Sequence, residues 1–340
     1  MHSPWQSFMH EQNATDMDNY YGHDLVNKLS LCDLTRDSVV LAQGADVESF
    51  LQGQLTNDLH LLTDTETQLQ GYCNAKGRLL CILRVARWKS GIIILLPREL
   101  EDGILKRLRM YVLRADVKLT PMSGQLASFG IVGHEREADL LADVYGSLPT
   151  SPRGCKRVGE RLLTAIPAPV ARYQVVGPSR KLEEDWQRLS QAYVPQDPRL
   201  WSWLDIMAGL PEIRTETQEL FVPQMANMDI IGGVSFKKGC YPGQEIVARM
   251  RYLGKLKQRM IRAHGESGEV PAPGEKIYAP DRGEQSAGTI VNSAANPEGG
   301  YDVLAVAQRS SIAGGELRLK SLTGERLTVQ DLPYSIDSDE

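Results

Sequence analysis

The sequence lacks the features that mark several large classes of protein. Its five cysteines are scattered, with no Cys-x-x-Cys pair and no histidine at ligand spacing. Neither a disulfide framework, nor a metal site, nor an iron–sulfur cluster of its own is therefore expected. No apolar run approaches the ~20 residues that span a bilayer, and the polar first two dozen residues lack a secretory signal. We expect a cytoplasmic protein that does not enter a membrane.

An excess of positive charge is also missing. The chain has 38 Lys and Arg against 43 Asp and Glu, which gives a net charge of −5. Because proteins bind nucleic acids largely by neutralising phosphates, bulk binding of tRNA or DNA is not expected, and any contact would need a local basic patch. Hydrophobic residues make up 42% of the 340 residues, which is enough for a substantial core and two or three domains.

Strand and helix signals alternate along the first two thirds of the chain. Short apolar runs predict strands, and apolar residues at helical spacing predict helices after Asp46 and Pro97. The predicted order is strand 39–43, a helix from 46, strands 67–74, 79–86 and 92–96, a helix from 97, strand 117–120, strand 126–132, helix 134–145, strands 161–166 and 173–176, and helix 178–191. This order predicts two split β-α-β units in tandem, an α+β fold.

The pattern changes after about residue 255. Short strands separated by Gly and Pro are predicted at 258–263, 276–278, 287–291, 303–306, 317–320 and 327–330, which is typical of a small β-barrel. The expected domains are a polar N-terminal tail (1–24), a first α+β unit (25–124), a second α+β unit (125–254) and the barrel (255–340). The two α+β ranges need not be separate in space.

The segment 238–245 reads Lys-Gly-Cys-Tyr-Pro-Gly-Gln-Glu and carries the most chemistry. A helix is predicted to begin at Pro242, with Glu245 in its first turn, so that Cys240 lies just before a helix N-terminus and beside two lysines. Such surroundings favour a thiolate over a thiol. A small buried hydrophobe in a turn is nevertheless the commoner role of a single cysteine, so both interpretations stay open.

Several separated motifs resemble the YgfZ family, a relative of the glycine-cleavage T-protein. They are Gly-Ala-Asp at 44–46, Gln-Gly-Gln-Leu-Thr-Asn-Asp at 52–58, Asn-Ala-Lys-Gly-Arg at 74–78, Pro-Gln at 223–224, Asn227, Gly-Gly at 232–233, the run 235–245 and Leu-Pro-Tyr-Ser at 332–335. Motifs in this order are far more specific than a lone Gly-Gln-Glu. The matching segments lie mainly between about residues 39 and 254.

The resemblance implies tandem ferredoxin-like units and a C-terminal barrel around a central opening that binds tetrahydrofolate. It also implies a role in the assembly, maintenance or repair of iron–sulfur enzymes, including those that thiomethylate tRNA. Reduced folate and these client enzymes are the partners that it implies. The family's essential cysteine corresponds to Cys240, as a nucleophile or redox-sensitive thiol. The rest of the segment supplies the further candidates Lys238, Tyr241, Gly243, Gln244 and Glu245.

Trp201 is the candidate for folate binding. It lies on a predicted helix, 200–208, outside the main apolar stripe of that helix. Its distance before the Ala-Gly-Leu-Pro at 208–211 matches a folate-binding Trp of the YgfZ family, and an indole can stack on a flat pterin or aryl ring. Packing between the two α+β units is the alternative role for this side chain.

Three positions depart from the relatives. Asp37 stands where the YgfZ family has a second folate-binding Trp, and Met207 stands where it has an acidic residue that can bond a pterin. The strand residues 80–84, Leu-Cys-Ile-Leu-Arg, lack the paired Asp of the T-protein. Aminomethyl transfer by the T-protein mechanism is therefore not expected, and folate affinity is expected to be weakened or the pocket differently lined.

Two further features have alternative interpretations. Asn57 and Asp58, at the end of a predicted helix, suit either a ligand contact or an Asx-type turn. Lys106, Arg107, Arg109 and Arg114 form a basic cluster that suits a solvated face, or contact with an acidic partner or a polyglutamyl tail. Two other functions also stay open, a tetrahydrofolate-dependent one-carbon (aminomethyl) transferase and a folate-independent docking scaffold for iron–sulfur proteins.

Overall fold

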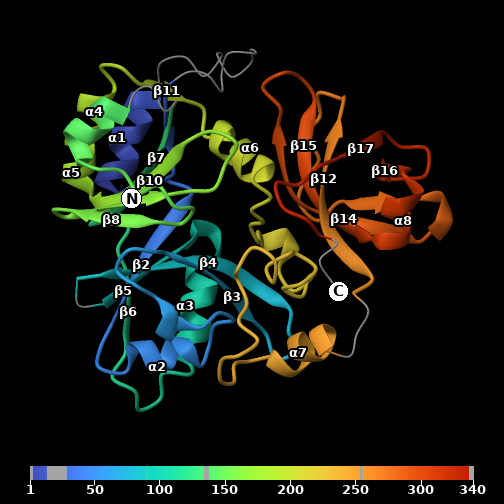
Figure 1. Ribbon diagram of the computed structural model, residues 1–340, viewed down its shortest axis with the longest axis horizontal. Helices are drawn as coiled ribbons and strands as arrows, with labels where there is room; N and C mark the ends of the chain where they lie inside the picture. Colours follow the sequence, from blue (N-terminus) through green and yellow to red (C-terminus); the bar gives the residue numbers. More distant parts are fainter. Residues whose placement is uncertain (1–2, 14–28, 90, 134–137, 253–255, 337–340) are drawn as a thin grey trace. The chain divides into compact units, whose positions relative to one another are not determined.

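The computed structural model describes residues 3–13, 29–89, 91–133, 138–252 and 256–336 (Figure 1). Its strands form a six-stranded sheet, a five-stranded sheet and a closed barrel. Helices join and cover these sheets, so the predicted α+β class is confirmed. Among the described residues, no helix combines the length and the apolar character needed to cross a membrane.

The six-stranded sheet has the order β11-β1-β7-β10-β9-β8. Its strands are β1 (Ser30–Asp33), β7 (Leu126–Val132), β8 (Cys155–Val158), β9 (Arg161–Ala165), β10 (Arg172–Pro178) and β11 (Val194–Gln196). β1 runs parallel to β11, whereas β7 is antiparallel to both β1 and β10. Every residue of β7 is buried, which explains its nearly unbroken apolar sequence.

Three helices contribute to the core of this sheet: α1 (Pro4–Asn13), α4 (Ala138–Tyr145) and α5 (Ser179–Leu189) (Figure 1). α5 packs on β7 and β10, and α1 packs on α5. The rings of Trp5 on α1 and Trp186 on α5 meet edge to face, with centroids 6.3 Å apart. The sequence predicts a polar tail over 1–24, but Trp5 and Met9, one turn apart, bury α1 in the core. Residues 14–24 and the predicted helix start at 134–137 lie outside the described residues.

The five-stranded sheet has the order β3-β4-β5-β2-β6. Its strands are β2 (Asp37–Gln43), β3 (Gln68–Cys73), β4 (Leu79–Trp88), β5 (Gly91–Pro97) and β6 (Lys118–Pro121). The connecting helices are α2 (Val47–Gln52), η3 (Leu59–Leu61), η4 (Arg98–Leu100) and α3 (Glu101–Arg109). Ile104, Leu105 and Leu108 of α3 are buried, as the helical spacing after Pro97 predicts. All five strands lie within a few residues of their predicted positions.

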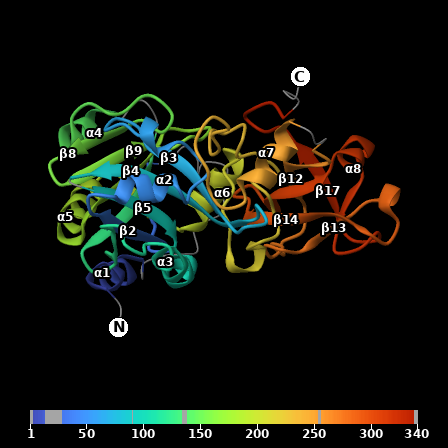
Figure 2. The ribbon, with the colours of Figure 1, turned by 90° about the horizontal axis from the view of Figure 1, so that it is seen from below.

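The C-terminal strands close into a barrel with the order β12-β15-β14-β13-β16-β17. They are β12 (Gln258–Gly265), β13 (Lys276–Tyr278), β14 (Ser286–Ala295), β15 (Tyr301–Gln308), β16 (Leu317–Leu319) and β17 (Arg326–Gln330), and η7 (Pro280–Arg282) follows β13. α8 (Arg309–Gly314) packs against β15. Figure 2 shows α8 with the barrel strands β12, β13, β14 and β17. Small and branched side chains fill the interior, including Ala305, Ile277 and Val303. The predicted barrel is confirmed.

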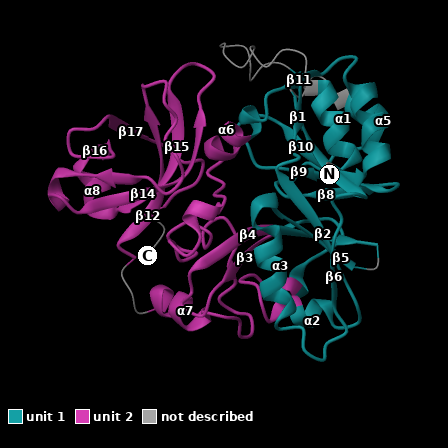
Figure 3. Cartoon of the chain, turned by 180° about the vertical axis from the view of Figure 1, so that it is seen from behind, with its two compact units in different colours: residues 1–50, 60–68, 84–201 teal, residues 51–59, 69–83, 202–340 magenta. Residues whose placement is uncertain are grey.

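Contacts divide the chain into two compact units, which are drawn in different colours in Figure 3. Unit 1 consists of Met1–Phe50, His60–Gln68 and Arg84–Trp201, and unit 2 of Leu51–Leu59, Leu69–Leu83 and Ser202–Glu340. Unit 2 therefore combines two short segments from the N-terminal third with the helices α6 (Arg199–Met207, from Ser202), η6 (Thr215–Thr217) and α7 (Gln244–Tyr252) and the barrel. The domain boundaries expected near residues 25, 125 and 255 stay a prediction.

Candidate functional site

The candidate site is the loop formed by residues 232–245 of unit 2, which we call the cysteine loop. Its first residues lie along the segment that follows α2. The Thr56 hydroxyl donates to the Gly233 carbonyl at 2.6 Å, and the Asn57 side-chain amide donates to the Gly232 carbonyl at 2.9 Å. Each of these bonds joins residues more than 170 positions apart, so the loop is held by a segment that is distant in sequence but adjacent in the fold.

Lys238 anchors the middle of the cysteine loop. Its ammonium donates to the Gln52 carbonyl at 2.5 Å and also to the Leu55 carbonyl, where α2 ends and leaves backbone oxygens without helical partners. It also lies over the Tyr241 ring, 5.1 Å from the centroid. Lys238 is only 8% exposed. This burial lowers the pKa of its ammonium to about 8, while the Asp58 carboxylate acts in the opposite direction.

Gly243 fixes the far end of the loop. Its φ is +81°, and a Cβ built there would lie 2.5 Å from the Asn74 carbonyl oxygen and from backbone atoms of Gly77. A side chain cannot occupy that position without moving the turn at 74–77. The sequence predicts that this helix begins at Pro242. The left-handed backbone of Gly243 explains why α7 begins at Gln244 instead.

Cys240 lies between these two anchors and is exposed to solvent. Both Lys238 and Tyr241, on either side of it, are buried. Because α7 begins at Gln244, Cys240 lies four residues before the helix and not immediately before its N-terminus as predicted. The buried neighbours therefore hold the loop in place while the Cys240 thiol between them stays exposed to solvent.

The other four cysteines, all among the described residues, are buried. Burial raises the pKa of Cys32 and of Cys73 to about 12. It raises the pKa of Cys155 to about 11, and that of Cys81 is raised by burial as well. These thiols stay protonated at neutral pH, which leaves Cys240 as the accessible one. No group of three His, Cys, Asp or Glu within the described ranges could hold a metal ion.

The remaining residues of the predicted site make contacts within unit 2. Gln244 donates to the Lys238 carbonyl at 3.4 Å, and Glu245 lies in the first turn of α7. The Asp58 carboxylate accepts from the Gln52 side chain at 2.9 Å, and the Asn57 side-chain oxygen accepts from the Asp58 amide at 2.8 Å. The two roles considered for Asn57 and Asp58 from the sequence, a ligand contact and an Asx-type turn, both stay predictions.

Trp201 belongs to unit 1 and is packed there. It is 4% exposed, and a Cβ at Gly130 of β7 would lie 2.4 Å from its ring. The Arg172 guanidinium lies over the indole, 4.6 Å from its centroid, and donates to the Trp201 carbonyl at 3.3 Å and to the Pro167 carbonyl at 2.8 Å. The sequence did not reveal Gly130 or Arg172 as the neighbours of this side chain.

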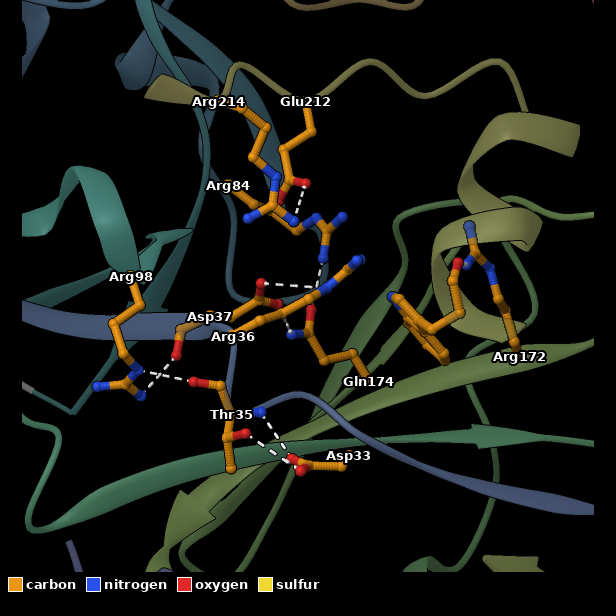
Figure 4. Close-up of polar contacts among 11 residues, drawn as sticks. Asp33, Thr35, Arg36, Asp37, Arg84, Arg98, Arg172, Gln174, Glu212 and Arg214 are labelled. Atoms are coloured by element: carbon orange, nitrogen blue, oxygen red, sulfur yellow. Dashed lines mark hydrogen bonds and ion pairs between the residues drawn. The ribbon is translucent and has the colours of Figure 1, made fainter. Parts of the chain in front are cut away.

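Asp37 begins a polar cluster in unit 1 (Figure 4). Its carboxylate accepts a hydrogen bond from Gln174 at 3.4 Å and lies 4.0 Å from Arg36. Arg84 donates to the Gln174 side-chain oxygen at 2.5 Å. Arg98 reaches the Asp37 carbonyl at 2.8 Å. Asp37 thus places a hydrogen-bonded carboxyl group where the resemblance implies a Trp.

Met207 has a partner of its own in unit 2. Its sulfur lies 2.9 Å from a guanidinium nitrogen of Arg262, which also donates to the Asp331 carbonyl at 3.0 Å. A thioether is a weak hydrogen-bond acceptor, so Met207 cannot take the place of the acidic residue that the resemblance implies here as an acceptor for a pterin.

The chain is similar to known proteins over most of its length. The tRNA-modifying protein YgfZ of Yersinia pseudotuberculosis serotype O:1b is 30% identical over 313 residues, 92% of this chain and 94% of that protein. The tRNA-modifying protein YgfZ of Yersinia enterocolitica serotype O:8 is 29% identical over the same shares. No family model matches the chain.

A solved structure shows the same fold. The glycine cleavage system aminomethyltransferase T from Bartonella henselae superposes with a TM-score of 0.74 at 13% identity, covering 91% of this chain and 87% of that one. This likeness confirms the predicted fold, with ferredoxin-like α+β units and a C-terminal barrel. Together with the sequence identity to the two Yersinia proteins, it leads to one conclusion: the chain belongs to the YgfZ family.

Proposed function

We propose that this protein is a folate-binding accessory factor for iron–sulfur enzymes that modify tRNA, and that Cys240 is its reactive group. The names of the Yersinia relatives connect the family with tRNA modification. Client enzymes that thiomethylate tRNA are the proposed partners, and the role places the protein in the cytoplasm, where tRNA is modified. The proposal has two parts, one for the thiol and one for folate.

The exposure of Cys240 is the observation that carries the proposal. Four of the five thiols are buried, whereas Cys240 lies in solvent on a loop that Lys238 and Gly243 hold on both sides. A thiolate is both a nucleophile and a soft ligand for iron. Both properties suit a protein that handles iron–sulfur enzymes, and an accessible thiol is needed for either.

A bacterial strain without its own YgfZ-family gene tests the role of the thiol. The strain carries this chain as wild type, Cys240→Ala or Cys155→Ala, and mass spectrometry measures the thiomethylated nucleosides in its tRNA. We expect a fall of about tenfold or more for Cys240→Ala, while the buried control stays close to wild type because its thiol is protonated and inaccessible. Equal nucleoside levels in Cys240→Ala and Cys155→Ala would show that the function does not need the Cys240 thiol.

Trp201 is the proposed contact for the reduced folate, which supplies one-carbon chemistry when bound. The indole is 4% exposed and lies under the Arg172 guanidinium. A flat ring can therefore stack on Trp201 only when Arg172 moves away. An arginine so displaced suits the carboxylates of a folate tail, so the two side chains fit the ligand after one rearrangement.

A folate-independent docking scaffold is the second candidate. It is favoured by the covered face of Trp201 and by the polar side chain of Asp37, which is held by Gln174 and Arg36. Aminomethyl transfer has less support, because the strand segment 80–84 in β4 carries no carboxylate and most of it is buried. The binding of tetrahydrofolate separates the first candidate from the second.

A further inference from the structure

Lys238 makes contacts that its neighbour Lys237 does not share. Lys238 is 8% exposed, whereas Lys237 is exposed to solvent. Lysine is rarely buried, because removing an ammonium from water is costly unless other groups replace the water. Here the carbonyls of Gln52 and Leu55 replace it, and the Tyr241 ring covers another side.

The two carbonyls come from a fixed part of the fold. They belong to the end of α2 and the residues after it, where the Gln54 and Leu55 amides bond back to the Leu51 carbonyl. Burial also lowers the pKa of the Lys238 ammonium to about 8. The contact therefore joins the cysteine loop to the end of a helix that lies 186 residues earlier in the sequence.

Only Gly239 separates this anchor from Cys240. On the other side, Tyr241 is buried, and Gly243 is in close contact with the turn at 74–77. A short segment held at both ends has few conformations, so the anchors limit where the thiol can point. Resting on the proposed function of Cys240, we propose that Lys238 is a positioning residue that holds the Cys240 thiol in one orientation through the carbonyls of Gln52 and Leu55.

A nitroxide spin label on Cys240 tests this positioning without reference to activity. The other four cysteines are buried, so the label attaches to Cys240 in the folded full-length chain. We expect Lys238→Met, which keeps the length of the side chain but removes the donors, to increase the label's mobility about threefold. The matched control Lys237→Met should leave the spectrum unchanged, and the same spectrum in both variants would overturn the proposal.

The deletion strain separates this inference from the proposed function. If Lys238 positions the thiol, Lys238→Met should lower the thiomethylated nucleosides of tRNA about as far as Cys240→Ala does, and Lys237→Met should not. If Cys240→Ala has full activity, the proposed function fails whatever the spin label shows. If Cys240→Ala is inactive while Lys238→Met has wild-type activity and label mobility, the positioning role fails and the proposed function stands.

A second variant decides the matter if Lys238→Met does not fold. One glycine inserted after Gly239 leaves Lys238 and its partners intact but loosens the link to Cys240, and a Cβ at Gly239 would meet nothing within 4 Å, so the loop has room. We expect a more mobile label and reduced nucleoside levels in the inserted chain. Wild-type mobility and activity there would show that the Lys238 anchor does not set the position of the thiol.

Discussion

At Gly130 on β7 and Gly243 before α7, the backbone approaches other atoms so closely that a side chain has no room. The neighbour of Gly130 is the Trp201 ring, and the neighbours of Gly243 are the backbone atoms of the turn at 74–77. Because folded interiors are closely packed, a single added methyl group at either place has to displace its surroundings. These two residues therefore test the packing around Trp201 and around the cysteine loop.

Gly130→Ala should destabilise the protein. The new Cβ would lie 2.4 Å from two ring atoms of Trp201, and we expect the free energy of unfolding to fall by about 1–3 kcal/mol in urea denaturation. Gly124→Ala is the control, since its Cβ would meet nothing within 4 Å and should change stability by less than about 0.5 kcal/mol. Equal stability of the two variants would show that Trp201 is not packed against β7.

Gly243→Ala should disturb the cysteine loop. Its φ of +81° and its contacts at 2.5 Å with Asn74 and Gly77 both oppose a side chain, so we expect a loss of about 1–3 kcal/mol of unfolding free energy. The spin label on Cys240 should also become more mobile. Gly239→Ala has open space and should match wild type in both measurements. A Gly243→Ala chain that matches wild type as well would argue against the docked loop.

The buried thiol of Cys73 should make stability fall at high pH. Burial raises its pKa from 9.0 to about 12, so the unfolded chain loses this proton at a lower pH than the folded chain does. The resulting stabilisation is present below pH 9 and is lost as the pH rises toward 12. Between pH 8 and pH 10, the free energy of unfolding, measured with urea, should fall by about 1.4 kcal/mol less for Cys73→Ala than for wild type. Parallel pH profiles would contradict this prediction.

Among the elements, the N-terminal helix α1 departs most from what the sequence suggests. Most of its residues are polar, but Trp5 and Met9 are buried together with Trp186 and Phe129. Trp5→Ala should therefore lower the unfolding free energy by about 3–5 kcal/mol, because it leaves a cavity in the core of unit 1. Glu11→Ala, at an exposed position on the same helix, should be nearly neutral. Two equally stable variants would mean that α1 does not pack on α5.

The elements that the sequence predicts well are those with strong local signals. β4, β5 and β7 have long apolar runs, and α3 and α5 have apolar residues at helical spacing. The missed strands β1, β8 and β11 have only three or four residues, too few for a pattern of alternation. The late start of α7 depends on Gly243, whose left-handed backbone is imposed by the turn at 74–77.

At the scale of the whole molecule, family motifs that are far apart in the sequence meet in unit 2. The motifs at 52–58 and 74–78 and the cysteine loop all belong to that unit, although much of the chain between them belongs to unit 1. The sequence identifies Cys240 and Lys238 as candidates through the resemblance. It cannot predict that Lys238 reaches the carbonyls of Gln52 and Leu55, because such contacts exist only after distant segments have folded together.

Calorimetric titration of the purified chain with tetrahydrofolate tests the central proposal, a folate-binding protein with a separate reactive thiol. The titration compares wild type, Trp201→Ala and Cys240→Ala. We expect saturable heat for wild type and Cys240→Ala, and little or none for Trp201→Ala, because only Trp201 is proposed to contact the folate ring. If wild type gives no binding heat, the folate proposal is wrong and the docking scaffold becomes the leading function.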